Sequence, residues 1–512
     1  MEIDLENMEN ILANIVAQKK LEIKHLYAQY PFDQLEKEAR EEMKNATASI
    51  PLFYQALADS RRSKKPFFIA EFKRKSPSEG WINREVDLPA QIRAYAQAGA
   101  GAISVLTDSP FFGGSYADLA LAAATLKQWL LVSETQRPLL LQKDFVLDPI
   151  QLYLAKRHGA DLILLIAAIL EPVQLENLRR LAESIGLGVL VEVHDAAELE
   201  RIRHLEFPVL GVNNRDLKTF RTALNRSNVL SRLAGERFLI AESGLRDYRD
   251  FQVVRTADGF LIGTSLMQDW SGSATSTFAA HFQAAGRLLF KACGIRTAAL
   301  LENTAADYLG INFSPLSKRR PDAATLAALK NLLSFPAHLV AVFYQNTEAG
   351  IRAVLADYPF KIIQLYAHDV TPEFVRSLRQ KVLLACAVHT SADLERLELF
   401  AADVDLFILD GASPGSGEGI RITIPADFPY PFLLAGGIHL DNLPILLAHP
   451  ACIGVDVASG LETAGQVDPH KIQAIADSLA TFSPPVNSQR ALNSVLMHGD
   501  VLQKNGSTTL DF

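Results

Sequence analysis

One pattern constrains the fold of this chain more than any other. Short, continuous apolar runs recur with amphipathic helical stretches between them, such as 172–184 and 196–204. Strands that are apolar throughout, rather than at every second residue, are typical of a parallel sheet covered by helices. The first set of runs is 67–72, 102–106, 139–142, 162–166, 188–192, 209–212, 238–241 and 259–262. Eight such units in about 200 residues predict a closed (β/α)8 barrel.

The same pattern restarts near residue 288. The second set of runs is 289–293, 309–313, 339–343, 362–365, 383–388, 406–409, 432–435 and 453–457. Residues 9–30 and 34–62 have helical periodicity and precede the first set. We therefore expect an α/β protein with two tandem (β/α)8 TIM barrels, the first with an N-terminal helical extension. The expected parts are a first barrel with its extension over 1–270, a helical linker over 271–287, a second barrel over 288–482 and a flexible polar tail over 483–512.

Charge and cysteine content narrow the class of function. The net charge of −8 gives no general case for binding nucleic acid or an anionic membrane. The cysteines Cys293, Cys386 and Cys452 show no CxxC pairing, which fits a reducing cytosol and argues against disulfides and a zinc site. The first ten residues have no apolar signal core, and no stretch is long and apolar enough to span a membrane. We expect a cytoplasmic protein that acts on small molecules.

Polar residues gather where the strands of the first barrel end, and barrel enzymes carry their active sites at that face. Glu71 and Lys73 are two positions apart at the end of the first run, so their side chains point to the same side. Taken alone, they fit a surface ion pair as well as a site. The other strand ends carry Lys143, Glu192, Asn213, Arg215, Glu242 and Ser243. Several lysines and glutamates on one rim would shift one another's pKa values, which suits acid–base chemistry.

Small residues follow the last two strands of this barrel. Gly244 follows the seventh, and Gly263 with Thr264 follows the eighth. Exposed backbone N–H groups at such positions bind phosphate well. Phe112 and Phe145 lie beside the polar groups, either as core residues or as an apolar wall for an aromatic substrate.

The motifs at these strand ends resemble those of a known family, and they occur in the same order along the chain. The motifs are AEFKRKSPSEG, SVLTDSPFFGGSY, LLQKDF, LVEVHD, GVNNRDL, AESGL and FLIGTSLM, and they resemble indole-3-glycerol-phosphate synthase over about residues 9–270. That family closes an indole ring on 1-(2-carboxyphenylamino)-1-deoxyribulose 5-phosphate, with loss of CO₂ and water. Thr264 stands where serine is usual and keeps a hydroxyl.

The resemblance implies a role for each matching residue. It implies that Lys143 is the general acid for the ribulose carbonyl and that Glu192 is the acid–base partner in the later dehydration. Glu71 and Lys73 would position and polarise the reacting groups. The remaining implied contacts are Asn213 and Ser243 with hydroxyls, Arg215 with the carboxylate region, Ser76 in the binding loop, and Gly244, Gly263 and Thr264 with phosphate. The chemistry needs no metal or redox cofactor, and the histidines show no HxH or HExxH spacing.

The second barrel has its own polar strand ends. Cys293 ends the first strand, which alone fits a small buried residue. Asp410 ends the sixth and precedes the Gly-rich segment 415–419. Arg319 is the best charged candidate for an anion contact. The last two strands end in Gly436 and Gly437 and in Ser459 and Gly460, which resemble the phosphate-binding residues of the first barrel.

This half is similar to phosphoribosylanthranilate isomerase over about residues 288–480. The motifs are KACGI, FSPLSKR, QLYA, LDGASPGSG, LAGGI and GVDVASGLE. The resemblance implies an Amadori rearrangement, with Asp410 as the general acid for the ring oxygen and Cys293 as the base for the C2′ proton. A thiolate at neutral pH needs a nearby positive charge, and Lys291 is one candidate. Tyr366 replaces the family's histidine, Ala292 replaces a larger aliphatic residue, and Ile420 stands where an aromatic residue is expected.

The leading hypothesis is a bifunctional enzyme of tryptophan biosynthesis whose second barrel makes the substrate of the first. In one alternative, the second barrel is a non-catalytic stabilising module. In another, both barrels are phosphosugar enzymes of a different pathway, against which the strand-end residues argue. We expect a monomer, because a fused pair needs no partner to keep both activities together.

Overall fold

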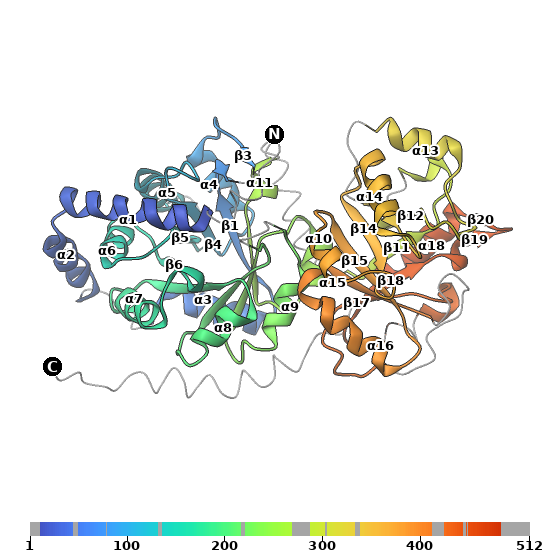
Figure 1. The fold of residues 1–512 in the computed structure, drawn as a ribbon. Helices are drawn as coiled ribbons and strands as arrows, with labels where there is room; N and C mark the ends of the chain where they lie inside the picture. Colours follow the sequence, from blue (N-terminus) through green and yellow to red (C-terminus); the bar gives the residue numbers. More distant parts are fainter. Residues whose placement is uncertain are drawn as a thin grey trace.

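The computed structural model describes residues 11–44, 50–77, 79–131, 136–216, 221–268, 287–302, 305–332, 338–411, 424–443, 447 and 449–482. Within these ranges the chain forms two closed barrels, each of eight parallel strands. The first half of the chain forms one barrel and the second half forms the other, and the two barrels lie side by side (Figure 1). The predicted fold class is therefore confirmed. No helix in the described ranges has the length and apolar character needed to cross a membrane. Residues 271–286 of the predicted linker 271–287, the Gly-rich segment with Ile420 and the tail 483–512 lie outside the described residues.

The first barrel closes in the order β1-β10-β9-β8-β7-β6-β5-β4. Its strands are β1 (Phe67–Phe72), β4 (Ala102–Leu106), β5 (Leu139–Lys143), β6 (Leu162–Ile166), β7 (Gly188–Val193), β8 (Val209–Asn213), β9 (Phe238–Glu242) and β10 (Gly259–Ile262). Its helices are α1 (Ile11–Gln29), α2 (Phe32–Lys44), α3 (Leu52–Ser63), α4 (Leu88–Gln97), α5 (Tyr116–Trp129), α6 (Pro149–Arg157), α7 (Pro172–Ser184), α8 (Ala196–Ile202), α9 (Asn225–Ser231), α10 (Tyr248–Val253) and α11 (Thr264–Gln268). A short hairpin of β2 (Lys75–Ser76) and β3 (Gly80–Trp81) follows β1. The predicted helical stretch 34–62 is two helices, because α2 ends at Lys44 and α3 begins only after Pro51.

The second barrel closes in sequence order from β11 to β18. Its strands are β11 (Leu289–Cys293), β12 (Tyr308–Asn312), β13 (Leu339–Val342), β14 (Ile362–Tyr366), β15 (Lys381–Ala387), β16 (Leu406–Asp410), β17 (Phe432–Leu434) and β18 (Cys452–Val457). Its helices are α13 (Ala323–Lys330), α14 (Glu348–Asp357), α15 (Pro372–Arg376), α16 (Ser391–Arg396), the 3-10 helix η4 (Leu397–Asp403) and α18 (Pro469–Ala480). A hairpin of β19 (Glu462–Thr463) and β20 (Gln466–Val467) follows β18.

A buried or partly buried aspartate precedes several strands in both barrels, and its carboxylate accepts a hydrogen bond from the start of the neighbouring strand. Asp161 accepts the N–H of Leu140 at 2.8 Å, and Asp405 accepts that of Val382 at 2.9 Å. Asp258 and Asp307 accept the N–H groups of Leu239 and Phe290 in the same way. Because a buried backbone donor needs a partner, these carboxylates stabilise the amino-terminal face of each barrel.

That face of the second barrel packs against α9, α10 and the loops after β8 and β9 of the first (Figure 1). Asp405 also accepts the N–H of Leu224 at 3.2 Å, and the Asn225 amide donates to the carbonyl of Ala401 at 2.8 Å. Lys381, at the start of β15, donates to Asp250 at 2.5 Å and to the Gly244 carbonyl at 3.2 Å. Residues at the amino-terminal ends of the second barrel's strands thus bind loops at the carboxyl-terminal face of the first barrel, which is the face that carries its candidate site.

Replacing Lys381 by alanine should therefore destabilise the protein measurably. Breaking a buried ion pair costs about 3–5 kcal/mol, and we expect about 3 because Asp250 still accepts the N–H of Arg246 at 2.9 Å. Urea unfolding followed by intrinsic fluorescence would measure the change. Arg62→Ala, which breaks an exposed pair with Asp59, is the control and should cost no more than about 0.5 kcal/mol. Equal losses for the two variants would contradict a stabilising role for Lys381.

Candidate active sites

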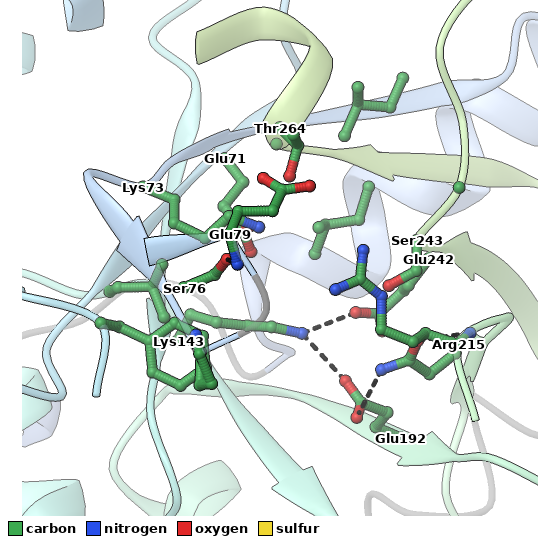
Figure 2. Close-up of a pocket in the computed structure, with 18 of the residues that line it drawn as sticks. Glu71, Lys73, Ser76, Glu79, Lys143, Glu192, Arg215, Glu242, Ser243 and Thr264 are labelled. Atoms are coloured by element: carbon green, nitrogen blue, oxygen red, sulfur yellow. Dashed lines mark hydrogen bonds and ion pairs between the residues drawn. The ribbon is translucent and has the colours of Figure 1, made fainter. Parts of the chain in front are cut away.

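A cavity of about 440 Å³ opens at the carboxyl ends of the first barrel's strands (Figure 2). This volume is in the range of small-molecule sites. Every candidate residue of the first barrel lines it. They are Glu71, Lys73, Ser76, Phe112, Lys143, Phe145, Glu192, Asn213, Arg215, Ser243, Gly244, Gly263 and Thr264. The rings of Phe112 and Phe145 lie 6.0 Å apart on one wall, where they can contact an aromatic substrate.

Lys143, the last residue of β5, lies at the centre of this cavity between two carboxylates (Figure 2). Its Nζ lies 2.6 Å from Glu242 and 2.9 Å from Glu192. Asn213 donates to the other oxygen of Glu192 at 3.2 Å. An ammonium has three N–H donors, so two carboxylate contacts leave one donor for a ligand.

The pKa values of Lys143, Glu192 and Glu242 are shifted by different amounts and in different directions. Burial lowers the pKa of Lys143, but Glu192 and Glu242 outweigh it and hold the ammonium charged. Burial also acts to raise the pKa of Glu192, yet Lys143 and His194 shift it well below its usual range. The pKa of Glu242 is raised by burial and by the neighbouring Glu192 charge. Of the two carboxyl groups beside Lys143, Glu192 is therefore shifted toward its ionised form and Glu242 toward its protonated form.

Glu71 and Lys73 form a second ion pair on the rim, 2.9 Å apart, as their spacing predicted. Burial favours the neutral form of Glu71, but Lys73 and Lys143 lower its pKa overall. Gly263 lies against this carboxylate, because a Cβ there would come within 2.4 Å of Glu71 Oε1. A glycine at this position leaves room for Glu71 as well as exposing backbone to the cavity.

The N-terminal helical extension contributes residues of α1 to the wall of the first-barrel cavity. Ile11, Leu12 and Ile15 of α1 line the cavity. Lys19 of the same helix is almost fully buried, and its Nζ lies 2.7 Å from Asp144, the neighbour of Lys143. The extension is therefore part of the site.

Sequence reasoning placed Glu242 at a strand end without giving it a role, and it did not consider His194. The signal for Glu242 was its position as the last residue of β9, beside Ser243. His194 lies 3.2 Å from both Glu192 and Glu198. Burial opposes the imidazolium, but the two glutamates raise the pKa of His194 to about 9. His194 therefore holds Glu192 in place as a charged partner.

A second cavity, of about 760 Å³, opens at the carboxyl ends of the second barrel's strands. Its lining includes the candidates Cys293, Arg319, Asp410, Gly436, Gly437 and Ser459. Gly460 is not among the lining residues. A Cβ at Gly460 would lie 2.0 Å from the carbonyl oxygen of Ile438, so this glycine permits a close backbone approach.

A buried ion pair lies at the wall of this cavity, which Asp456 lines. Lys291 and Asp456 are register partners on β11 and β18, and their charged atoms are 2.9 Å apart. A Cβ on Gly310 would lie 2.9 Å from the sulfur of Cys293 and 3.1 Å from Nζ of Lys291, so both side chains lie on the same side of their strand. Burial raises the pKa of Cys293 overall, although Lys291 favours the thiolate. Lys291 therefore acts in the expected direction, but burial outweighs it.

Asp410 ends β16 and receives two hydrogen bonds. The hydroxyl of Tyr366 donates to it at 3.1 Å, and the N–H of Gly411 donates at 2.8 Å. Burial and the neighbouring Asp456 raise the pKa of Asp410 to about 6. Tyr366 thus contacts the candidate general acid from the position where the family has histidine. Arg319 lies at the rim with Glu462, at 2.8 Å.

Comparison with known proteins divides the chain in the same way. The family model described as indole-3-glycerol phosphate synthase matches residues 12–276, and the one described as N-(5'phosphoribosyl)anthranilate (PRA) isomerase matches residues 290–478. Each match covers one of the two barrels.

Curated relatives match across both barrels. The tryptophan biosynthesis protein TrpCF of Yersinia pestis is 31% identical over 492 residues, which cover 94% of this chain and 96% of that protein. The indole-3-glycerol phosphate synthase of Polynucleobacter necessarius is 38% identical and covers 51% of this chain and 95% of its own length. A solved phosphoribosyl anthranilate isomerase from Thermus thermophilus is 28% identical, covers 38% of this chain and 98% of its own, and has a TM-score of 0.32. Because both family models match and the TrpCF relative matches over nearly its full length, the chain belongs to the family of bifunctional tryptophan-biosynthesis enzymes, with an indole-3-glycerol phosphate synthase in its first barrel and a phosphoribosylanthranilate isomerase in its second.

Proposed function

We propose that Lys143 is the general acid of ring closure in the first barrel. The observation that carries this proposal is the position of its ammonium between Glu192 and Glu242, with a third N–H available in the cavity. As the aromatic carbon attacks the ribulose carbonyl, the carbonyl oxygen gains negative charge. An ammonium in a largely buried site stabilises that charge and can transfer a proton to it.

The later steps use the neighbouring groups. After CO₂ leaves, Glu192 is the acid–base partner of the dehydration, in which the new hydroxyl takes up a proton and departs as water. Glu71 and Lys73 position and polarise the reacting groups, and Asn213 and Ser243 hold substrate hydroxyls. The remaining substrate contacts are Arg215 with the carboxylate, Phe112 and Phe145 with the aromatic ring, Ser76 in the binding loop, and Gly244, Gly263 and Thr264 with the phosphate.

In the second barrel, Asp410 protonates the ribose ring oxygen and Cys293 removes the C2′ proton. The raised pKa of Asp410 supports the first role, because a carboxyl group that titrates near 6 keeps a protonated fraction closer to neutrality. Arg319 contacts an anionic group of the substrate. Gly436, Gly437, Ser459 and Gly460 form the phosphate end.

Both activities can be followed on the intact chain. Purified protein given phosphoribosylanthranilate should consume its fluorescence and accumulate indole-3-glycerol phosphate, with both compounds quantified. A chain that makes the ribulose intermediate but never the indole would contradict the proposed first-barrel site.

Replacing Tyr366 by phenylalanine should shift the pH profile of the isomerase. The acid limb of kcat/KM reports whichever essential group has the lower pKa, which here is Asp410. The Tyr366 hydroxyl stabilises the Asp410 carboxylate, so its removal should raise the Asp410 pKa and move the acid limb to higher pH. A hydrogen bond of about 0.5–1.5 kcal/mol corresponds to roughly 0.4–1 pH unit.

Tyr344→Phe is the matched control. Its ring contacts that of Tyr366 at 4.8 Å, and no hydrogen bond links its hydroxyl to Asp410. The acid limb of this variant should stay in place. An equal shift in the two variants, or none in Tyr366→Phe, would show that the Tyr366 hydroxyl does not tune Asp410.

The proposed division of the chain is the one expected from the sequence, with parts 1–270, 271–287, 288–482 and 483–512. We further propose a cytoplasmic monomer that acts on small phosphorylated substrates, not on nucleic acid or membranes. Sedimentation velocity would contradict the monomer if the main species had twice the mass of 56.2 kDa.

A further inference from the structure

The first-barrel cavity has one lining residue that comes from the second barrel. Lys361, which immediately precedes β14, lies at its edge together with Gly244 and Arg246. The interface holds Lys361 there. Its backbone carbonyl accepts the N–H of Lys381 at 3.0 Å, and the Lys381 ammonium bonds the carbonyl of Gly244 at 3.2 Å. The two lysines are therefore anchored beside the loop that follows β9.

The charged groups in this cavity leave a role for such a lysine. Lys73 is paired with Glu71, and Lys143 is paired with Glu192 and Glu242. Arg246, on the same loop as Gly244, lies 3.5 Å from Asp250. The side chain of Lys361 is exposed, and among the described residues no carboxylate lies within ion-pair distance of it. It is thus a cation at the cavity edge that is free to meet an anionic ligand.

The substrate carries two anionic groups, and because Arg215 is proposed to contact the carboxylate, the phosphate has no assigned cation. The phosphate end is proposed at Gly244, Gly263 and Thr264. Backbone N–H groups there supply hydrogen bonds but no full positive charge. A lysine on a long flexible stem can supply that charge from the edge of the site.

We propose that Lys361 binds the phosphate of the synthase substrate, so that the isomerase barrel completes the substrate site of the synthase barrel. This proposal rests on the proposed phosphate end of the first-barrel cavity. It makes the second barrel part of the first active site, in addition to its own catalysis.

The test is a series of Lys361 variants in the full chain, assayed with the ribulose intermediate added directly. We expect KM to rise roughly three- to tenfold in Lys361→Ala, between the effects of an exposed ion pair and of a buried charged hydrogen bond. Lys361→Glu should raise KM further, and Lys361→Arg should stay near the wild-type value. We expect kcat to change less than twofold, and isomerase turnover to be unaffected.

A substrate that lacks the phosphate identifies the group that Lys361 binds. With 1-(2-carboxyphenylamino)-1-deoxyribulose, wild type and Lys361→Ala should have the same kcat/KM. Arg379→Ala is the matched control, because it removes one exposed positive charge close to the start of β15 from a residue that does not line the cavity. It should leave KM unchanged for both substrates.

An unchanged KM in Lys361→Ala would overturn the proposal, and so would an equal loss with and without the phosphate. If the alanine variant unfolds more easily, Lys361→Gln keeps most of the side-chain stem, and a folded Gln variant with wild-type KM would overturn it as well. Wild-type turnover in the same assay tests the synthase site itself. If a Lys361 variant is active and its KM equals that of wild type, the result therefore contradicts the role of Lys361 but not the proposed synthase site.

Discussion

Replacing Lys143 by alanine should lower kcat for indole-3-glycerol phosphate formation by roughly 10²–10⁴, the usual loss when a general acid is removed. The ammonium is the group that meets the developing charge on the carbonyl oxygen. Its loss also leaves Glu192 and Glu242 buried together without a cation between them. The ionised form of Glu192 thereby loses its nearest cation, which should raise the pKa of Glu192 and weaken its part in dehydration as well.

The measurement is a single-turnover assay with the ribulose intermediate, alongside the isomerase assay on the same preparation. Isomerase activity should be retained, because Cys293 and Asp410 line a separate cavity. Lys75→Ala is the control, since Lys75 donates to the carbonyl of Pro110 and does not line the cavity. Lys143→Met, which keeps side-chain volume, should lose as much activity as Lys143→Ala. Near-normal turnover in either Lys143 variant would remove Lys143 from its proposed role.

Asp410→Asn should have the opposite selectivity, with loss of isomerase activity and retention of synthase activity. An amide of the same shape keeps the hydrogen bond from Gly411 and can still contact Tyr366, but it cannot deliver a carboxyl proton to the ring oxygen. We expect isomerase kcat/KM to fall by roughly 10²–10⁴ while synthase turnover is unchanged.

Decay of phosphoribosylanthranilate fluorescence measures this effect directly. Asp477→Asn, an exposed position on α18 that accepts a hydrogen bond from Gln473, is the matched control and should behave as wild type. If Asp410→Asn retained more than a tenth of wild-type activity, another group would have to be the acid. A loss of synthase activity in this variant would indicate damage that extends beyond the second-barrel site.

The strands of both barrels could be located from sequence because a parallel barrel strand is apolar on both sides. The predicted ends fell one residue short at Lys143, Asn213, Glu242 and Asp410, each of which the structure includes as the last residue of its strand. Apolar character stops before these residues, whereas the hydrogen-bonded ladder continues through them. The strand prediction therefore failed where a polar side chain points into a cavity.

Other features depend on packing that no local pattern encodes. The contact of Lys143 with Glu242 joins residues 99 positions apart. The contact of Tyr366 with Asp410 follows from the curvature of the second barrel, and that of Lys381 with Asp250 depends on how the two barrels meet. The raised pKa of Cys293 results from burial, which the sequence motif around this residue did not reveal.

The direction in which the second barrel faces has a consequence for metabolism. Its strand starts pack against α9 and α10, so the carboxyl ends of its strands, where its cavity lies, face away from the first barrel. We expect a ribulose intermediate released there to enter bulk solvent before it reaches a synthase site. The fusion therefore delivers the two catalysts in a fixed one-to-one ratio rather than a private passage. Flux through the pair then depends on the free pool of intermediate that the cell maintains.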